Sequence, residues 1–102
     1  MSININNYTF DGPYSSTDKI EDSSGIYAII CKKSDKNYII DVGESAKVKY
    51  RVENHDRKDC WNKNCREKLT VAVYYTPNLH QSGRMEIEQE IRNKYDIPCG
   101  KV

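Results

Sequence analysis

Three short runs of β-branched and aromatic residues constrain most strongly what this chain can fold into. They are GIYAIICK at residues 25–32, YIIDV at residues 38–42 and LTVAVYYT at residues 69–76. Runs of this length and composition are typical of buried strands. The five polar residues between the first two runs suit a hairpin. The pattern therefore predicts a small sheet of three strands.

Two helical stretches accompany these strands. Ser45 can cap a helix of roughly ten residues that reaches toward His55. The segment from about Leu79 to Tyr95 carries apolar residues at the i, i+4 and i+8 positions of an amphipathic helix. Residues 56–68 read as a charged connection. The expected fold is an α+β domain in ββαβα order, with a mixed or antiparallel three-stranded sheet flanked by helices.

The chain has 102 residues, which is the size of one domain. Residues 1–24 contain turn signals and few apolar residues, so we expect an extended N-terminal arm followed by a domain at residues 25–102. No apolar run approaches the ~20 residues needed to cross a bilayer, so a membrane partner is not expected. The N-terminus lacks the basic-then-apolar pattern of an export signal. The expected location is cytoplasmic.

Four cysteines stand at positions without a CxxC pair: Cys31, Cys60, Cys65 and Cys99. With a cytoplasmic location, the expectation is reduced thiols rather than a disulfide scaffold. The alternative is a structural zinc site. It would combine His55, Cys60 and Cys65 with His80 or Cys99, but their spacing matches no common zinc-ligand pattern.

The charge is unevenly distributed along a chain whose net charge is only +1. Residues 46–68 hold eight basic and four acidic residues, which leaves +4, whereas residues 1–24 carry −3. A polyanion would therefore find one attractive stretch. The predicted DNA-phosphate contacts are Lys47, Lys49, Lys58 and Lys63. The alternative interpretation is a solvated helix and loop with many lysines.

Individual side chains suggest chemistry only weakly. Tyr27 lies in an apolar strand beside a glycine, which more often marks a core residue. Arg51 and His55 are four residues apart on the expected helix and would share one face, which more often is a solvated face. Glu88 stands between Ile87 and Ile91, close to an apolar boundary where a carboxylate either loses solvation or holds a cation.

The order of these residues resembles the GIY-YIG nuclease superfamily. Gly25-Ile26-Tyr27 and a strand ending in Val42-Gly43 resemble the two short strand motifs that name it. The Gly43-Glu44-Ser45 turn leads to Arg51 and His55, as in the family's R-x-x-x-H helix. Glu88, followed by Pro98, resembles the family's metal-binding glutamate before a closing proline. The resemblance covers residues 25–100.

The resemblance implies hydrolysis of DNA phosphodiesters with one Mg²⁺ or Mn²⁺ ion. Tyr27 would activate or orient the attacking water, Arg51 would neutralise the scissile phosphate, and His55 would assist in proton transfer or positioning. Glu88 would hold the metal. A planar guanidinium matches two phosphate oxygens, and a carboxylate is the hard ligand that Mg²⁺ prefers.

Two positions depart from the family pattern. Asp41 stands where the second motif usually supplies a tyrosine, and it could accept a proton, touch the metal or repel the phosphate. Cys99 and Gly100 follow Pro98, where the family often has an asparagine. The rival hypotheses are a degenerate domain that binds nucleic acid without cleaving it, and a small interaction module. Selectivity for DNA would come from residues 56–68, a partner protein or a homodimer.

Overall fold

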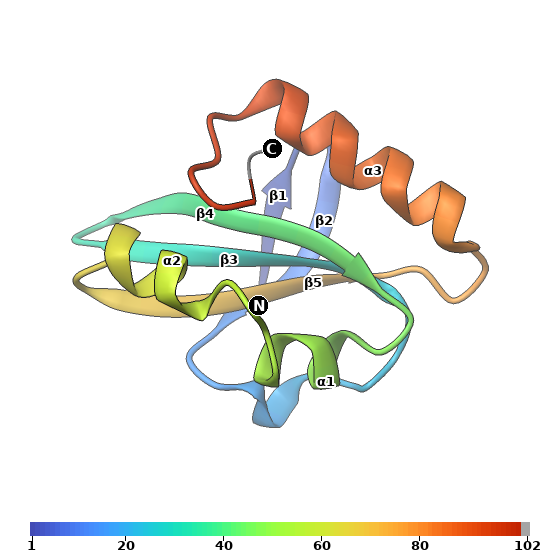
Figure 1. Ribbon diagram of the computed structural model, residues 1–102, viewed down its shortest axis with the longest axis horizontal. Coiled ribbons are helices and arrows are strands. Elements are labelled where there is room, and N and C mark those ends of the chain that lie inside the picture. Colours follow the sequence, from blue (N-terminus) through green and yellow to red (C-terminus); the bar gives the residue numbers. More distant parts are fainter. Residues whose placement is uncertain (101–102) are drawn as a thin grey trace.

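The computed structural model describes residues 1–100, which form a five-stranded antiparallel sheet with helices on both faces (Figure 1). The strands lie side by side in the order β1-β2-β5-β3-β4. In chain order the elements are β1 (Ser2–Ile5), β2 (Tyr8–Tyr14), the 3-10 helix η1 (Thr17–Lys19), β3 (Gly25–Lys33), β4 (Lys36–Ser45), α1 (Val48–Glu53), α2 (Lys58–Asn64), β5 (Lys68–Tyr75) and α3 (Gln81–Lys94). No helix within residues 1–100 is long and apolar enough to cross a membrane.

The three apolar runs form neighbouring strands. β3 pairs with β4 on one side and with β5 on the other, and its residues 25–31 are all buried. A strand covered on both faces needs no polar alternation, which is why this run is continuously apolar. The expected three-stranded sheet in ββαβα order is nevertheless wrong, because two further strands and a further helix belong to the fold.

The additional strands come from the N-terminal segment, residues 1–24, which was expected to be an extended arm. β1 and β2 form a hairpin, and β2 joins the sheet beside β5. Asn6 and Asn7 make its turn with positive φ angles of 48° and 69°, a conformation that asparagine tolerates better than most residues. Ile5 and Phe10 enter the core with 2% and 0% of their surface exposed. The few apolar residues of this segment are therefore placed where they bury fully.

The helices also differ from expectation. α1 ends at Glu53, so His55 lies beyond the helix and shares no helical face with Arg51. A distant residue caps α1, because the Tyr50 backbone N–H donates to Asp22 Oδ1 over 3.0 Å. The charged connection at residues 56–68 contains helix α2. The apolar content of α2 is little more than one tryptophan, so periodicity could not reveal it.

The sheet separates two cores. One lies between the sheet and helices α1 and α2, and it includes Tyr27, Val48 and Trp61. The other lies under α3 and includes Val42 and Ile91. Because β3 alternates, Tyr27 faces the α1 and α2 side while its neighbours face α3. This alternation determines which side of the sheet the candidate site occupies.

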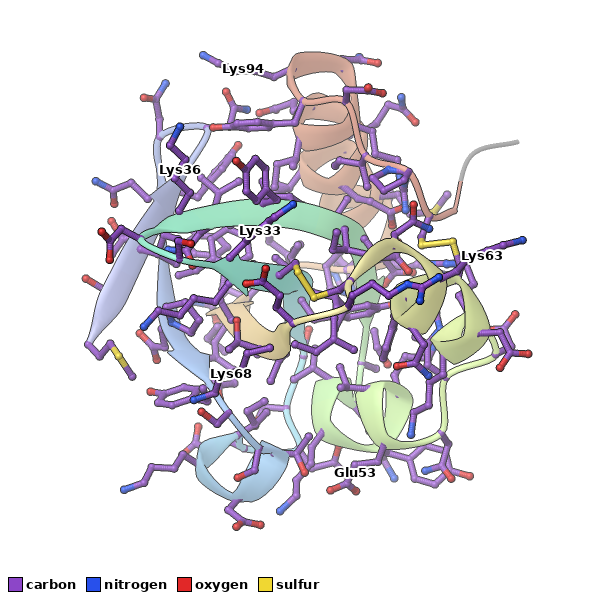
Figure 2. All side chains as sticks on the ribbon, turned by 90° about the vertical axis from the view of Figure 1, so that its left-hand side faces the viewer. Lys33, Lys36, Glu53, Lys63, Lys68 and Lys94 are labelled. Carbon is purple, nitrogen blue, oxygen red and sulfur yellow. A yellow bond between two sulfur atoms is a disulfide. The ribbon has the colours of Figure 1, made fainter. Side chains whose placement is uncertain are left out.

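The cysteines form two disulfides, so the expectation of reduced thiols is wrong for this structure. Cys31 pairs with Cys65, and Cys60 pairs with Cys99. Both bonds appear in Figure 2 and connect α2 and the residue after it to β3 and to the C-terminal segment. The paired cysteines are 34 and 39 residues apart, and sequence spacing gives no signal for such pairs. The cysteines of the alternative zinc site are consumed by the same bonds, and residues 1–100 hold no group of three or more potential metal ligands.

Candidate functional site

A hydrogen-bonded pair of Tyr27 and His55 forms the centre of the candidate site. The Tyr27 Oη atom lies 2.6 Å from His55 Nε2. The backbone N–H of Arg57 donates to His55 Nδ1 over 3.0 Å. Because Nδ1 accepts this bond, the proton of a neutral imidazole sits on Nε2 and is donated to the Tyr27 oxygen. The Tyr27 hydroxyl hydrogen then remains available to another acceptor.

Gly43 makes room for this phenol. It lies in β4 directly opposite Tyr27 in β3, rather than in the turn expected from the sequence. A Cβ atom at this position would lie 2.2 Å from the Tyr27 Oη atom and 2.4 Å from Cζ, far inside van der Waals contact. The aromatic ring therefore rests against the bare backbone of its neighbour. Any larger residue at position 43 would displace it.

Burial sets the protonation of both rings. It raises the pKa of Tyr27 to about 12, and the positive charges of Arg57 and Arg51 oppose that shift only in part. It lowers the pKa of His55 to about 4, and the same two arginines lower that pKa further. At neutral pH the phenol is therefore protonated and the imidazole is uncharged. Tyr27 is 1% exposed and His55 is 6% exposed, so neither ring meets solvent freely.

Arg51 reaches this pair from α1. Its Nη2 atom lies 2.9 Å from Asp56 Oδ1, and its side chain is 36% exposed. Asp56 Oδ1 also lies 3.5 Å from His55 Nδ1, so this exposed carboxylate brings the guanidinium close to the imidazole. The proximity of Arg51 to His55 therefore comes from the turn after α1, and not from helical spacing.

Glu88 lies on α3, which covers the opposite face of the sheet from Tyr27, yet its charge still raises the pKa of Tyr27. Its Oε2 atom accepts a 3.2 Å hydrogen bond from Arg92, and 26% of its side chain is exposed. Within residues 1–100 it belongs to no group of three or more potential metal ligands. A hard cation such as Mg²⁺ needs few protein ligands when water and a phosphate complete its shell. The remaining carboxylate oxygen suits such an ion.

Asp41 connects the two sides of the site. A β-bulge between Ile29 and Ile30 interrupts the pairing of β3 with β4 next to it. The carboxylate is 0% exposed and accepts bonds from Arg57, Arg92 and Trp61 as well as from its neighbour's backbone N–H. Both oxygens are occupied, so this arrangement offers neither a proton acceptor nor a free metal ligand. It holds α2 and α3 against β4.

Arg57, Trp61 and Arg92 belong to the site although sequence reasoning overlooked them. Trp61 Nε1 donates to Asp41 over 2.8 Å, and its ring lies 4.7 Å from that of His55. One signal was present: an aspartate inside the apolar run YIIDV must find partners when it is buried. The sequence did not indicate which cations would supply them.

The predicted DNA-contacting lysines lie on the surface around α1 and α2. Lys47, Lys58 and Lys63 are exposed, and Lys49 is half-buried. Lys58 donates to the Glu53 carbonyl oxygen, which ties α2 to the end of α1. Lys63 extends away from the body of the protein (Figure 2). These lysines surround the α1 and α2 side, where the Tyr27 and His55 pair also lies.

A cavity of about 440 Å³ opens on the same face of the sheet. Tyr14, Trp61 and Val71 contribute to its lining, whereas Tyr27 and His55 do not. Trp61 therefore stands between this cavity and the imidazole, and the Tyr27 phenol is not reached through it.

No known family model matches the chain, and neither a curated protein nor a solved structure shows significant similarity to it.

Proposed function

We propose that the chain is a metal-dependent endonuclease of the GIY-YIG type that hydrolyses DNA phosphodiester bonds. The observation that carries this proposal is the 2.6 Å contact between Tyr27 and His55, on which the charges of Arg51 and Glu88 also act. These four residues come from β3, the turn after α1, α1 itself and α3.

The protonation of Tyr27 supports one of its two expected roles. A phenol with a pKa of about 12 is a poor base at neutral pH, so Tyr27 would orient the attacking water through a hydrogen bond, and the proton of that water would pass to a phosphate oxygen of the substrate. His55 donates to the phenol oxygen and holds the ring in place. Arg51 neutralises the scissile phosphate after exchanging its exposed partner Asp56 for a phosphate oxygen.

Glu88 would hold the Mg²⁺ or Mn²⁺ ion through the carboxylate oxygen that Arg92 leaves free. When bound, such an ion polarises the phosphoryl group and stabilises the leaving oxygen. The half-exposed position of Glu88 leaves room for the water ligands that Mg²⁺ retains. Arg92 keeps the side chain directed toward β4.

Plasmid cleavage in Mg²⁺ or Mn²⁺ tests the proposal. Wild type should nick or linearise the plasmid, and Arg51→Ala and Glu88→Gln should lower the rate by roughly 100-fold or more. Glu86→Gln is the matched control, because Glu86 is an exposed residue of the same helix. Tyr27→Phe should slow cleavage and leave DNA affinity nearly unchanged. Equal activity in wild type and all variants would sink the proposal.

A second candidate function is a degenerate domain that binds nucleic acid without cleaving it. The low exposure of Tyr27 and His55 favours it, since a phosphate can reach these rings only after neighbouring side chains move. Binding that weakens steeply with salt, together with no cleavage in either metal, would select this candidate.

DNA is the proposed partner, and a homodimer or partner protein as the source of specificity stays a prediction. The cytoplasmic location also stays a prediction, and the two disulfides make it testable. Disulfides persist mainly in oxidising compartments. Protein trapped with a thiol-blocking reagent directly from cells should carry four free thiols in a reducing cytoplasm. Four unmodified cysteines, held in intact disulfides at both pairs, would indicate an oxidising compartment instead.

A further inference from the structure

The arginines of the candidate site differ in how many of their donors are already used. A guanidinium has five N–H donors. Arg92 contacts Glu88, Asp41 and the carbonyl oxygens of Val42 and Cys99, which leaves it almost saturated. Its side chain is 14% exposed. Arg92 therefore links α3 to β4, and few of its N–H donors remain free to bind a ligand.

Arg57 has the opposite pattern. Its Nε and Nη2 atoms donate to the two Asp41 oxygens over 2.8 and 3.2 Å, which uses one side of the guanidinium plane. The end of the plane that carries Nη1 and the second Nη2 hydrogen has no protein partner among residues 1–100. The side chain is 29% exposed. A planar fork with a free end can bind a second anion in a bidentate manner.

The position of Arg57 is also fixed from both ends. Its backbone N–H is bonded to His55, and its side chain is bonded to a carboxylate that has no exposed surface. Asp41 is itself immobilised by Trp61 and Arg92. Preorganisation of this kind lowers the entropy lost when a ligand binds. Among the surrounding charges, that of Arg57 acts most strongly on Tyr27, ahead of that of Arg51.

We propose that the free end of the Arg57 guanidinium binds a DNA phosphodiester, and that Asp41 is the positioning residue that holds it for this contact. The inference rests on the proposed function for the identity of its ligand. Asp41 thereby has a role that a tyrosine at this position could not fill. A carboxylate carries a negative charge and binds a guanidinium through two oxygens, whereas a phenol has one oxygen and no charge.

The test measures binding of a fluorescent double-stranded oligonucleotide by anisotropy over a salt series. Ca²⁺, which takes the same oxygen ligands, replaces Mg²⁺ to limit cleavage. Arg57→Ala should weaken binding about tenfold or more and lower the salt slope by about one phosphate contact. Lys36→Ala is the control, because Lys36 is exposed, lies outside the basic stretch 46–68 and makes no ion pair within residues 1–100. It should change neither quantity.

The outcomes separate this inference from the proposed function. If wild type binds DNA without cleaving it and Arg57→Ala still weakens binding, the nuclease proposal fails and the phosphate site stands. If wild type cleaves DNA and Arg57→Ala behaves like Lys36→Ala, the site is overturned and the nuclease proposal stands. Absence of DNA binding by wild type at low salt overturns both.

Arg57→Lys keeps the inference testable if Arg57→Ala does not fold, and Asp41→Asn tests the positioning role if it does. Arg57→Lys retains the charge and loses the fork, so it should keep the salt slope and bind about tenfold more weakly. Affinity equal to wild type would overturn the bidentate contact. Asp41→Asn should weaken binding in the wild-type background and add little to Arg57→Ala. Additive losses would show that Asp41 acts independently of Arg57.

Discussion

Lowering the pH from 7 to 5 should destabilise the protein, because a buried imidazole resists protonation. The His55 side chain has no exposed surface, and its pKa is lowered to about 4 by burial first and then by the charges of Arg51 and Arg57. Asp41 and Asp56 oppose this shift without reversing it. In the unfolded chain the same imidazole titrates near ~6.5. At a pH between these two values, the imidazole is therefore mostly protonated in the unfolded state and mostly neutral in the folded state.

The sign and size of the effect follow from these two pKa values. Between pH 6.5 and pH 4 the unfolded state carries more protons, so the free energy of unfolding increases with pH and decreases as acid is added. The stabilisation is present above the unfolded pKa and is lost as the pH falls toward the folded one. The expected loss is about 2 kcal/mol between pH 7 and pH 5, and about 3 kcal/mol by pH 4. Most carboxylates titrate below this first interval, which isolates the histidine.

Urea unfolding of the oxidised protein at pH 7, 6 and 5 measures the effect, with the fluorescence of Trp61, the chain's single tryptophan, as the signal. His55→Gln should remove the dependence between pH 7 and 5, and the exposed His80→Gln should keep it. An NMR titration should find the His55 ring neutral at pH 5 with its proton on Nε2. The reasoning is refuted if wild type is equally stable at pH 7 and 5, or if His55 titrates near its ordinary value.

Three further changes test the packing around the site. Gly43→Ala places a Cβ atom 2.2 Å from the Tyr27 oxygen, so it should cost about 1–3 kcal/mol in thermal unfolding and move the phenol in a crystal structure. Trp61→Phe removes the indole donor from the buried carboxylate, and urea unfolding should show a loss of about 1–3 kcal/mol. Cys99→Ser opens a 39-residue loop to Cys60, with an expected loss of about 4 kcal/mol in urea unfolding, and a dithiol reductant that opens both disulfides should destabilise wild type by more than this.

The strands β3, β4 and β5 could be predicted from their apolar runs, whereas β1 and β2 could not. β3 and β5 lie within about one residue of the apolar runs that indicated them. β1 and β2 were missed because they bury only Ile5 and Phe10 fully, and a Gly-Pro pair interrupts the second strand. α2 was missed because its stability comes from Trp61 and two disulfides rather than from an amphipathic face. Tertiary contacts stabilise these elements, so the local sequence pattern did not indicate them.

The residues of the candidate site also differ in whether the sequence could indicate them. Tyr27, Arg51 and Glu88 could be named because a resemblance in order and spacing pointed to them. Arg57 could not, because its importance depends on a carboxylate sixteen positions away. The partner of that carboxylate on α3 lies fifty-one positions further along the chain. Ion pairs of such separation are set by the packed fold, and a single sequence contains no periodicity that reports them.

The charge balance of the site determines how a nuclease built this way would have to bind DNA. Three guanidinium groups face three carboxylates, namely Arg51, Arg57 and Arg92 against Asp41, Asp56 and Glu88. A balanced cluster attracts a phosphate only weakly until a positive charge is added. Asp56 is 73% exposed and can leave Arg51, whereas the buried Asp41 cannot leave Arg57. Under the proposed function, a divalent metal bound at Glu88 would make the site net positive and strengthen its attraction for a phosphate. Bound metal should therefore raise the affinity for DNA, and bound DNA should raise the affinity for the metal by the same factor.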